Sequence, residues 1–281
     1  MSETAKKNIV KFKTSAWLWL FTVLVMLAAA VYQRRAGPTY PFRSSANIGG
    51  QQINFRLPRS AENTRPAKVT IPDPGVQARL LWRRYPVDEP FTVVFFGPEV
   101  SGGKNVLTAE IPPQDAAGKV EYRIEMASAA IPDGEEETVV LRFKGPVSAP
   151  LLLSHILAML AGMLVGTRAG IGAAFGRDEK LLPWVALAMI AIGGLLLGPL
   201  VQKAAFGAYW TGWPFGSDLT DNKTLLMFLG WLAACLLALH PKARRPAIVA
   251  ASLLALFVYL VPHSLRGSQL DYQQGVVQTG Q

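Results

Sequence analysis

The chain has 281 residues, of which 51% are hydrophobic and only 17% are charged, and its formal net charge is +9. Soluble proteins carry about 25% charged residues, and the apolar residues here form long blocks around a polar middle. This pattern indicates a membrane protein with an extramembrane domain. The positive charge does not indicate nucleic-acid binding, because the basic residues lie beside the apolar blocks and the middle has no Lys/Arg run with interleaved aromatics.

The first apolar block covers residues 16–32 and follows a short N-terminal segment, residues 1–15, that carries four lysines. Such a block is long enough to predict a membrane-spanning helix. Trp17 and Trp19 are typical interfacial anchors, which favours an uncleaved anchor. The alanines at 28–30 leave open the alternative of a cleaved signal peptide. Either interpretation places the following domain outside the cytoplasm.

Residues 40–147 predict an extracytoplasmic all-β domain, because short β-rich runs alternate with Gly, Pro, Asp and Asn clusters. Seven strands are expected, at 52–57, 67–71, 76–85, 91–96, 105–111, 119–126 and 138–143. The strand at 119–126 alternates cleanly and resembles the late strand of fibronectin-type-III or immunoglobulin-like domains. That resemblance implies a sandwich. The residues expected to face its core are Leu81, Val93, Val120, Tyr122 and Val140.

Residues 150–262 predict a bundle of four further membrane helices, at 150–166, 181–201, 224–239 and 246–261. The fold class is therefore a bundle of five transmembrane helices with the β-sandwich inserted between the first two. Small residues four apart let helices approach closely. The second and third helices are accordingly expected to pack through Gly162, Gly166, Gly194 and Gly198.

The basic residues set an orientation, because cytoplasmic flanks of membrane helices are enriched in Lys and Arg. With the N-terminus in the cytoplasm, the loop with Arg168, Arg177 and Lys180 is also inside, as are the basic residues at 242–245. The β-domain, a loop at 202–223 and a tail at 263–281 are then extracytoplasmic. The sequence thus predicts a multi-pass protein of the inner (plasma) membrane.

The extracytoplasmic loop at 202–223 gathers Tyr209, Trp210, Trp213 and Phe215 among glycines and a proline, followed by Asp218 and Asp221. An aromatic belt at the headgroup level is one explanation. The Gly and Pro residues favour a rigid, shaped surface instead. Both aspartates are expected to cap the next helix, whose N-terminus favours negative charge.

This loop and the helix after it resemble the tryptophan-rich haem-handling region of cytochrome c assembly membrane proteins. The similarity covers residues 150–267 with gaps, and it includes Gly207 to Trp210, Asp218, Trp231 and His240. It implies haem b held by two extracytoplasmic histidines, which match His155 and His263. The loop differs from the family by an insertion and a missing tryptophan, the bundle is shorter, and the family lacks an N-terminal β-domain.

Topology supports the same interpretation, because His155 and His263 fall on the side of the aromatic loop. A haem needs axial imidazoles and an apolar cleft, and its propionates would meet Arg266 or Lys203. The predicted cofactor and iron site is therefore His155, His263, Trp210, Trp213, Asp218 and Arg266. The alternative is that these histidines only cap helices or lie at the interface.

The sequence contains no catalytic motif such as GxSxG, HExxH, a P-loop or GxGxxG, and its single Cys235 excludes a CxxC pair. These features favour a role without catalysis. The two functional hypotheses are a haem-handling, cytochrome c assembly-like protein and a membrane accessory or scaffold subunit whose β-domain binds a protein partner. Membrane lipids are expected partners in both cases, and nucleic acid in neither.

Overall fold

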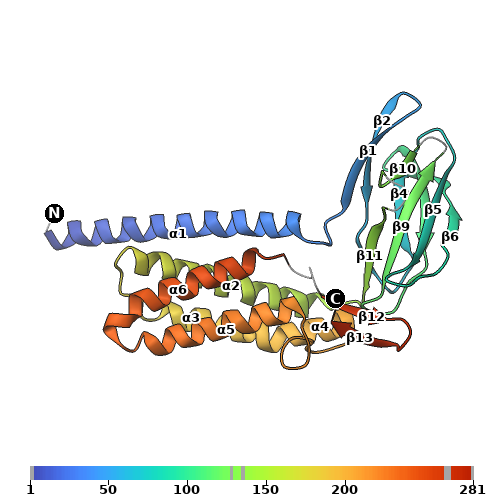
Figure 1. Ribbon diagram of the computed structural model, residues 1–281. Helices are drawn as coiled ribbons and strands as arrows, with labels where there is room; N and C mark the ends of the chain where they lie inside the picture. Colours follow the sequence, from blue (N-terminus) through green and yellow to red (C-terminus); the bar gives the residue numbers. More distant parts are fainter. Residues whose placement is uncertain (1–2, 127–128, 134–136, 263–266, 280–281) are drawn as a thin grey trace. The chain divides into compact units, whose positions relative to one another are not determined.

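The computed structural model describes residues 3–126, 129–133, 137–262 and 267–279 (Figure 1). The chain divides into two compact units. The helical unit contains Met1–Gly37, Ser148–Val201 and Tyr209–Arg266. The β unit contains Pro38–Val147, Gln202–Ala208 and Gly267–Gln281. The chain therefore enters the β unit three times.

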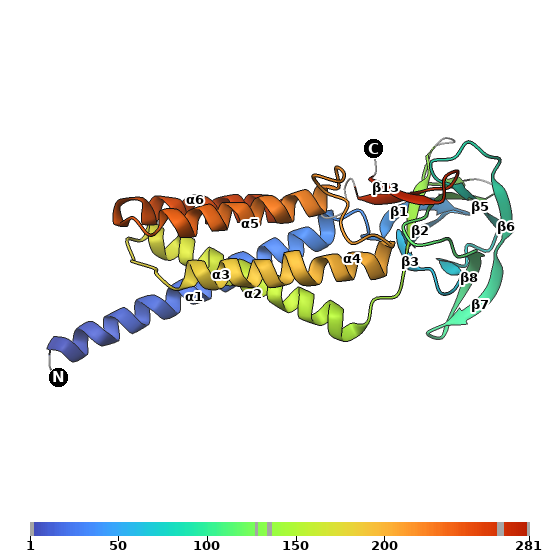
Figure 2. The ribbon, with the colours of Figure 1, turned by 90° about the horizontal axis from the view of Figure 1, so that it is seen from below.

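The helices of the first unit run lengthwise beside one another (Figures 1 and 2). They are α1 (Glu3–Ala36), α2 (Ala149–Ala174), α3 (Leu182–Ile190), the π-helix η1 (Ala191–Leu197), α4 (Gly198–Phe206), α5 (Leu219–Leu237) and α6 (Pro241–Leu260). Since α3, η1 and α4 follow without a break, they form one helical rod, whose last residues belong to the β unit. The expected order of helices is therefore present, with longer boundaries.

Among the described residues, four helices are long and apolar enough to cross a membrane: Ser15–Ala36, Ala149–Ala174, Leu182–Phe206 and Pro241–Leu260. Helix α5 is not among them. Its first turn carries Asp221 and Lys223, which lower its mean hydropathy. The coarse prediction of a mixed helical and β protein with membrane-capable helices is thus confirmed.

Glycines set the contacts between α2 and its neighbours. A Cβ at Gly162 would lie 2.9 Å from Ile190 of α3, and a Cβ at Gly193 would lie 2.9 Å from Met159 of α2. Gly166 instead faces Trp231 of α5, and Gly194 faces Thr224 of α5. The predicted contact between α2 and the third helix is present at Gly162 and at Gly198, where a Cβ would lie 3.7 Å from His155 Cε1 of α2. Gly166 and Gly194 mainly contact α5.

Arg168 is expected in a loop from the sequence, but it lies in helix α2. Helix α2 continues to Ala174 and buries Arg168 in the helical unit. Its Nη1 lies 2.9 Å from Glu179 Oε1, and its guanidinium lies 5.4 Å from the ring centre of Trp19 on α1. This buried pair joins α1, α2 and the segment after α2. The basic charge is therefore paired inside the protein and is not a free cytoplasmic flank.

The β unit contains two main sheets. Their strands are β3 (Ser60–Glu62), β4 (Ala67–Pro72), β5 (Ala78–Arg84), β6 (Thr92–Phe95), β7 (Gly97–Ser101), β8 (Lys104–Ile111), β9 (Lys119–Met126), β10 (Ala129–Ile131) and β11 (Val139–Lys144). The larger sheet has the order β3-β11-β9-β5-β6, with β10 beside β9, and the smaller has the order β4-β8-β7. Hairpins β1–β2 (Phe42–Ile48, Gln51–Leu57) and β12–β13 (Ser268–Asp271, Val276–Thr279) complete the unit.

One hydrophobic core lies between these strands. It draws Val69, Ile71 and Ile111 from the smaller sheet and Leu80, Val120, Tyr122, Ile124, Leu141 and Phe143 from the larger one. The prediction that Val120 and Tyr122 face the core is confirmed.

Three of the expected core positions differ from the structure. The prediction that Val93 faces the core is wrong, since its side chain is 45% exposed and its neighbour Val94 packs on the core instead. Val140 is only half-buried, while Val139 and Leu141 on either side of it are core residues. Leu81 is buried but lies outside the core cluster, because it pairs with Val93 on the other face of the sheet.

The C-terminal hairpin packs on the β unit (Figure 2). Leu270 N donates to Ala117 O (3.1 Å), Lys119 Nζ donates to Gln269 Oε1 (2.7 Å), and Tyr272 Oη donates to Lys119 O (2.7 Å). The end of α4 also contacts this unit, because Gly145 N donates to Ala205 O at 2.8 Å. Residues expected to form a plain tail therefore contain two strands of the domain.

Candidate functional site

His155 lies on α2 beside the π-helix η1. Its Nδ1 is 2.8 Å from the carbonyl oxygen of Gly193. In the neutral tautomer that donates from Nδ1, the Nε2 atom carries the lone pair. Histidines that bind a metal usually donate their other ring N–H to a carbonyl or carboxylate in this way. The contact therefore orients His155 in a manner suited to ligation through Nε2.

The π-helix makes this contact possible. A π turn places its carbonyls differently from an α turn, and such turns often occur at functional sites. Here Gly193 and Gly194 are buried, and a Cβ at Gly193 would lie 3.0 Å from Met159 N. Since glycine has no Cβ, η1 can approach α2 closely enough for His155 to reach Gly193 O.

The aromatic loop between α4 and α5 is held by the first turn of α5. Asp221 is buried and its Oδ2 accepts hydrogen bonds from Thr211 N (2.6 Å) and Gly212 N (3.0 Å). Asn222 Oδ1 accepts one from Trp213 N at 2.6 Å. Buried backbone N–H groups need such partners, so these two side chains fix the path of the loop.

Asp218 is the N-cap of α5, and its Oδ1 accepts from Thr220 N (2.8 Å) and from Asp221 N (3.4 Å). The expected capping role of Asp218 is thereby confirmed. The side chain is buried, and its carboxylate satisfies the first N–H groups of the helix. Asp221 holds the loop rather than the helix end.

The aromatic side chains of the loop are presented outwards from the helical unit. Trp213 is 67% exposed and Phe215 is 82% exposed, and Tyr209 is also exposed. Trp210 is half-buried and its Nε1 donates to Trp213 O at 3.0 Å. The loop therefore exposes several aromatic rings on a backbone that is held by hydrogen bonds. The indole N–H of Trp210 is already engaged within it.

A second polar group that the sequence analysis missed lies where α6 ends. Lys223 is buried, and its Nζ donates to the carbonyl oxygen of Val261. Gln33 of α1 donates to the same carbonyl at 2.8 Å and to Tyr259 O. These bonds satisfy the last carbonyls of α6. The available signal was a lysine and a glutamine at the ends of otherwise apolar helices.

Two residues of the predicted haem site, His263 and Arg266, lie outside the described residues. Their approach to His155 therefore stays a prediction. Lys203, the other expected propionate partner, donates to Gly207 O at 2.6 Å. Within the described part of the chain, no group of three His, Cys, Asp or Glu residues is arranged to hold a metal ion.

Comparison with known proteins gives no match: no family model, no curated protein and no solved structure is similar to this chain.

Proposed function

We propose that this chain is a non-enzymatic accessory subunit of the inner (plasma) membrane that crosses the membrane five times. Its N-terminus lies in the cytoplasm, and its immunoglobulin-like domain lies outside and binds a partner protein. The observation that carries this proposal is the exposed, apolar edge strand β6 of the larger sheet.

We infer the topology from the three chain segments that belong to the β unit. The β-domain follows α1, the segment Gln202–Ala208 includes the end of the third apolar helix, and Gly267–Gln281 follows α6. Because these three segments pack into one unit, they occupy the same side of the membrane. Helix α6 is itself a candidate span, so it begins on the opposite side. This topology requires a crossing between Ala208 and Pro241, and we assign it to α5, which is not among the four candidate spans.

Charge supports the same orientation. Arg177 and Lys180 lie in the connection after α2, and Lys242 and Arg245 lie in the first turns of α6, which this topology assigns to the cytoplasm. Arg244 Nη1 lies 2.6 Å from Asp178 Oδ1, so the start of α6 contacts the connection after α2. An excess of Lys and Arg in short connections is characteristic of the cytoplasmic side.

Cysteine labelling tests this topology, because the chain has a single cysteine. In a Cys235→Ser background, Ser101→Cys and Lys242→Cys place thiols at exposed positions of β7 and α6. A membrane-impermeant maleimide should label Ser101→Cys in intact spheroplasts and Lys242→Cys only after permeabilisation. Equal labelling of both in intact spheroplasts would contradict five crossings.

The strand order supports an immunoglobulin-like domain. Sandwiches of that type place strands B, E and D in one sheet and C, F and G in the other. The order β4-β8-β7 corresponds to the first set, and β5-β9-β11 corresponds to the second. The short strand β3 adds in parallel to β11. The core shared by both sheets is consistent with this arrangement.

The partner surface is the edge of the larger sheet. Strand β6 lies at the end of the order β3-β11-β9-β5-β6, and Phe95 is 72% exposed beside the exposed Val93. Edge strands are normally protected by charges, prolines or bulges because their free N–H and C=O groups can pair with another chain. The strand Thr92–Phe95 contains neither a charge nor a proline. It is therefore suited to receive an extended segment of a partner.

A photo-crosslinking amino acid at Phe95 tests this surface in living cells. We expect one defined adduct with a protein from position 95 and none from Glu110, an exposed position on β8. The variant Phe95→Asp should abolish the co-purification of that protein while the circular dichroism of the chain is unchanged. If crosslinks at 95 and 110 give the same products, the edge strand is not a specific interface.

A second candidate function is haem handling, and the contact between His155 Nδ1 and Gly193 O favours it. His155 would supply one axial imidazole through Nε2, with the iron supplying the redox chemistry. An absorption spectrum of the purified protein should then show a Soret band that His155→Ala and His263→Ala each reduce. His240→Ala is the matched control. A colourless protein after expression with excess haem would exclude this function.

A further inference from the structure

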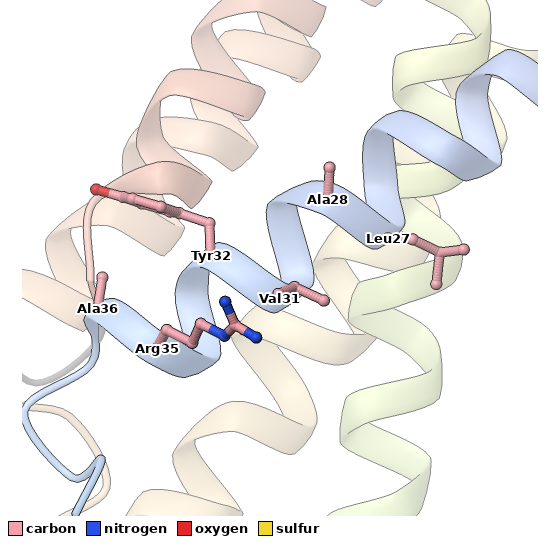
Figure 3. Close-up of a pocket in the computed structure, with 6 residues that line it drawn as sticks. All are labelled: Leu27, Ala28, Val31, Tyr32, Arg35 and Ala36. Atoms are coloured by element: carbon pink, nitrogen blue, oxygen red, sulfur yellow. The ribbon is translucent and has the colours of Figure 1, made fainter. Parts of the chain in front are cut away.

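A groove runs along the second half of α1. It is a shallow depression that is widely open on its outer side, and the residues that line it all belong to α1 (Figure 3). The lining residues are Leu27, Ala28, Val31, Tyr32, Arg35 and Ala36. They recur at intervals of four residues, so they form one stripe of the helix surface. We call this stripe the α1 groove.

The opposite side of α1 is fixed to the helical unit. Met26 is buried, and its Sδ lies 3.6 Å from Thr167 Oγ1 of α2. Gln33 donates to two carbonyls at the end of α6. Because these contacts fix the rotation of α1, the groove keeps one orientation. It faces away from the partners of α1, and Leu27 is accordingly 58% exposed.

The groove is apolar along its length and basic at one end. From Leu27 to Arg35 the helix rises ~12 Å at 1.5 Å per residue. Figure 3 shows the side chain of Arg35 running back along α1 toward Val31, as side chains on helices do. An arginine presents several N–H groups in a plane that matches a phosphate. The groove therefore combines an acyl-chain surface with a phosphate-binding group.

We propose that the α1 groove binds an anionic phospholipid, with one acyl chain along Leu27, Ala28 and Val31 and the phosphate at Arg35. A partner helix is the other conceivable occupant. An apolar helix would bury the Arg35 guanidinium without an acceptor, which is costly, whereas a lipid phosphate neutralises it.

This proposal rests on α1 being a retained membrane helix, as in the proposed function, but not on its direction. The leaflet that supplies the lipid follows from the topology, which places Arg35 at the outer surface. Lipid binding and cysteine labelling can therefore fail independently of each other. Inverted labelling with intact lipid binding would overturn the orientation alone.

Native mass spectrometry of the full-length protein tests the groove. Delipidated protein in mild detergent is titrated with phosphatidylglycerol or phosphatidylcholine. We expect phosphatidylglycerol to bind more tightly and Arg35→Gln to weaken its binding ~10-fold, the order expected for a charge-assisted contact. Arg34→Gln removes the same charge one residue away, outside the groove, and should leave the affinity within ~2-fold of the wild type.

A second variant tests the apolar part of the site. Ala28→Trp fills the groove and keeps Arg35, so it should displace the lipid without changing the net charge. Equal losses in Arg34→Gln and Arg35→Gln would reduce the effect to general charge attraction and overturn the proposal. Equal affinity for the two lipids, or unchanged binding in Ala28→Trp, would overturn it as well. Persistent co-purification of a protein helix in place of lipid would assign the groove to a subunit contact.

Discussion

Lys119 occupies the first position of β9, opposite Arg142 of β11 and against Gln269 of the C-terminal hairpin. Burial, together with the smaller effect of the neighbouring Arg142, lowers the pKa of Lys119 from its ordinary value of 10.5 to about 8. The folded protein therefore releases this proton at a lower pH than the unfolded chain does.

The free energy of unfolding should consequently rise between about pH 8 and pH 10. In this interval the unfolded chain still binds the proton and the folded chain does not. The unfolded state therefore becomes less favourable relative to the folded state as the pH rises. Below about pH 8 both states are protonated, and this group adds no pH dependence. Thermal unfolding in detergent at pH 7.5, 8.5 and 9.5 measures the effect.

Lys119→Met should flatten that rise, and the exposed Lys104→Met should keep it. An undiminished rise in Lys119→Met would assign the effect to another group. The rise from Lys119 ends near pH 10, where the unfolded chain also loses this proton. Above that pH, Tyr272 acts in the opposite direction. Burial raises the pKa of Tyr272 to about 12, so the unfolded chain releases that phenol proton first.

At the scale of single residues, the sequence predicts where the strands lie better than it predicts which face of a sheet each residue occupies. All seven expected strands are present as β2, β4, β5, β6, β8, β9 and β11. In β9, polar and apolar residues alternate, and Val120 and Tyr122 are correctly placed. In β6 and β11, adjacent valines fit either face. Only the pairing with neighbouring strands decides between Val93 and Val94, and a shift of one residue exchanges the faces.

At the scale of elements, apolar length predicts the helices, and local chemistry predicts only some of their ends. Asp218 before an apolar run is a recognisable N-cap. The extension of α2 beyond Gly166 is not recognisable, because it depends on Arg168 meeting Glu179 and Trp19. The π-helix η1 is equally hidden, since it arises from close packing of Gly193 on Met159 of another helix.

Gly194 is the contact that we expect to be most sensitive in the helical unit. A Cβ there would lie 2.5 Å from Thr224 Cγ2 of α5. Gly194→Leu should therefore push α5 away and destabilise the unit, by about 1–3 kcal/mol for an overfilled contact. Thermal unfolding in detergent measures the loss.

The control for this substitution is Ala250→Leu, which enlarges an exposed position of α6 and should leave the melting temperature nearly unchanged. An unchanged melting temperature for Gly194→Leu would mean that this face of η1 is not packed on α5.

At the scale of the whole molecule, the main departure from expectation is that the β unit is discontinuous in sequence. Lys119 and Gln269 are 150 residues apart along the chain and yet share a hydrogen bond. Periodicity and turn residues describe neighbours in sequence, so they carry no information about such a pair. The segment at 263–281 therefore looked like a tail.

Leu270→Ala tests whether the C-terminal hairpin stabilises the β unit. Leu270 is buried and its N–H bonds to Ala117 O. We expect a loss of about 2 kcal/mol, at the low end for a buried Leu→Ala change, and faster hydrogen exchange across residues 268–279. Val276→Ala in the same hairpin changes an exposed side chain and should have little effect. Identical exchange in both variants would show that the hairpin is not held through Leu270.

The three-part β unit has a consequence for biosynthesis. In the proposed topology, the ribosome makes Pro38–Val147 first, and the strands at 268–279 emerge only after four more helices have been made and inserted. At about 5–20 residues per second, the domain remains incomplete for on the order of ten seconds on the far side of the membrane. During that interval the binding place of Leu270 is an open apolar surface. Correct insertion of the last helix is thus required before the domain can close, which couples export of its C-terminus to domain maturation.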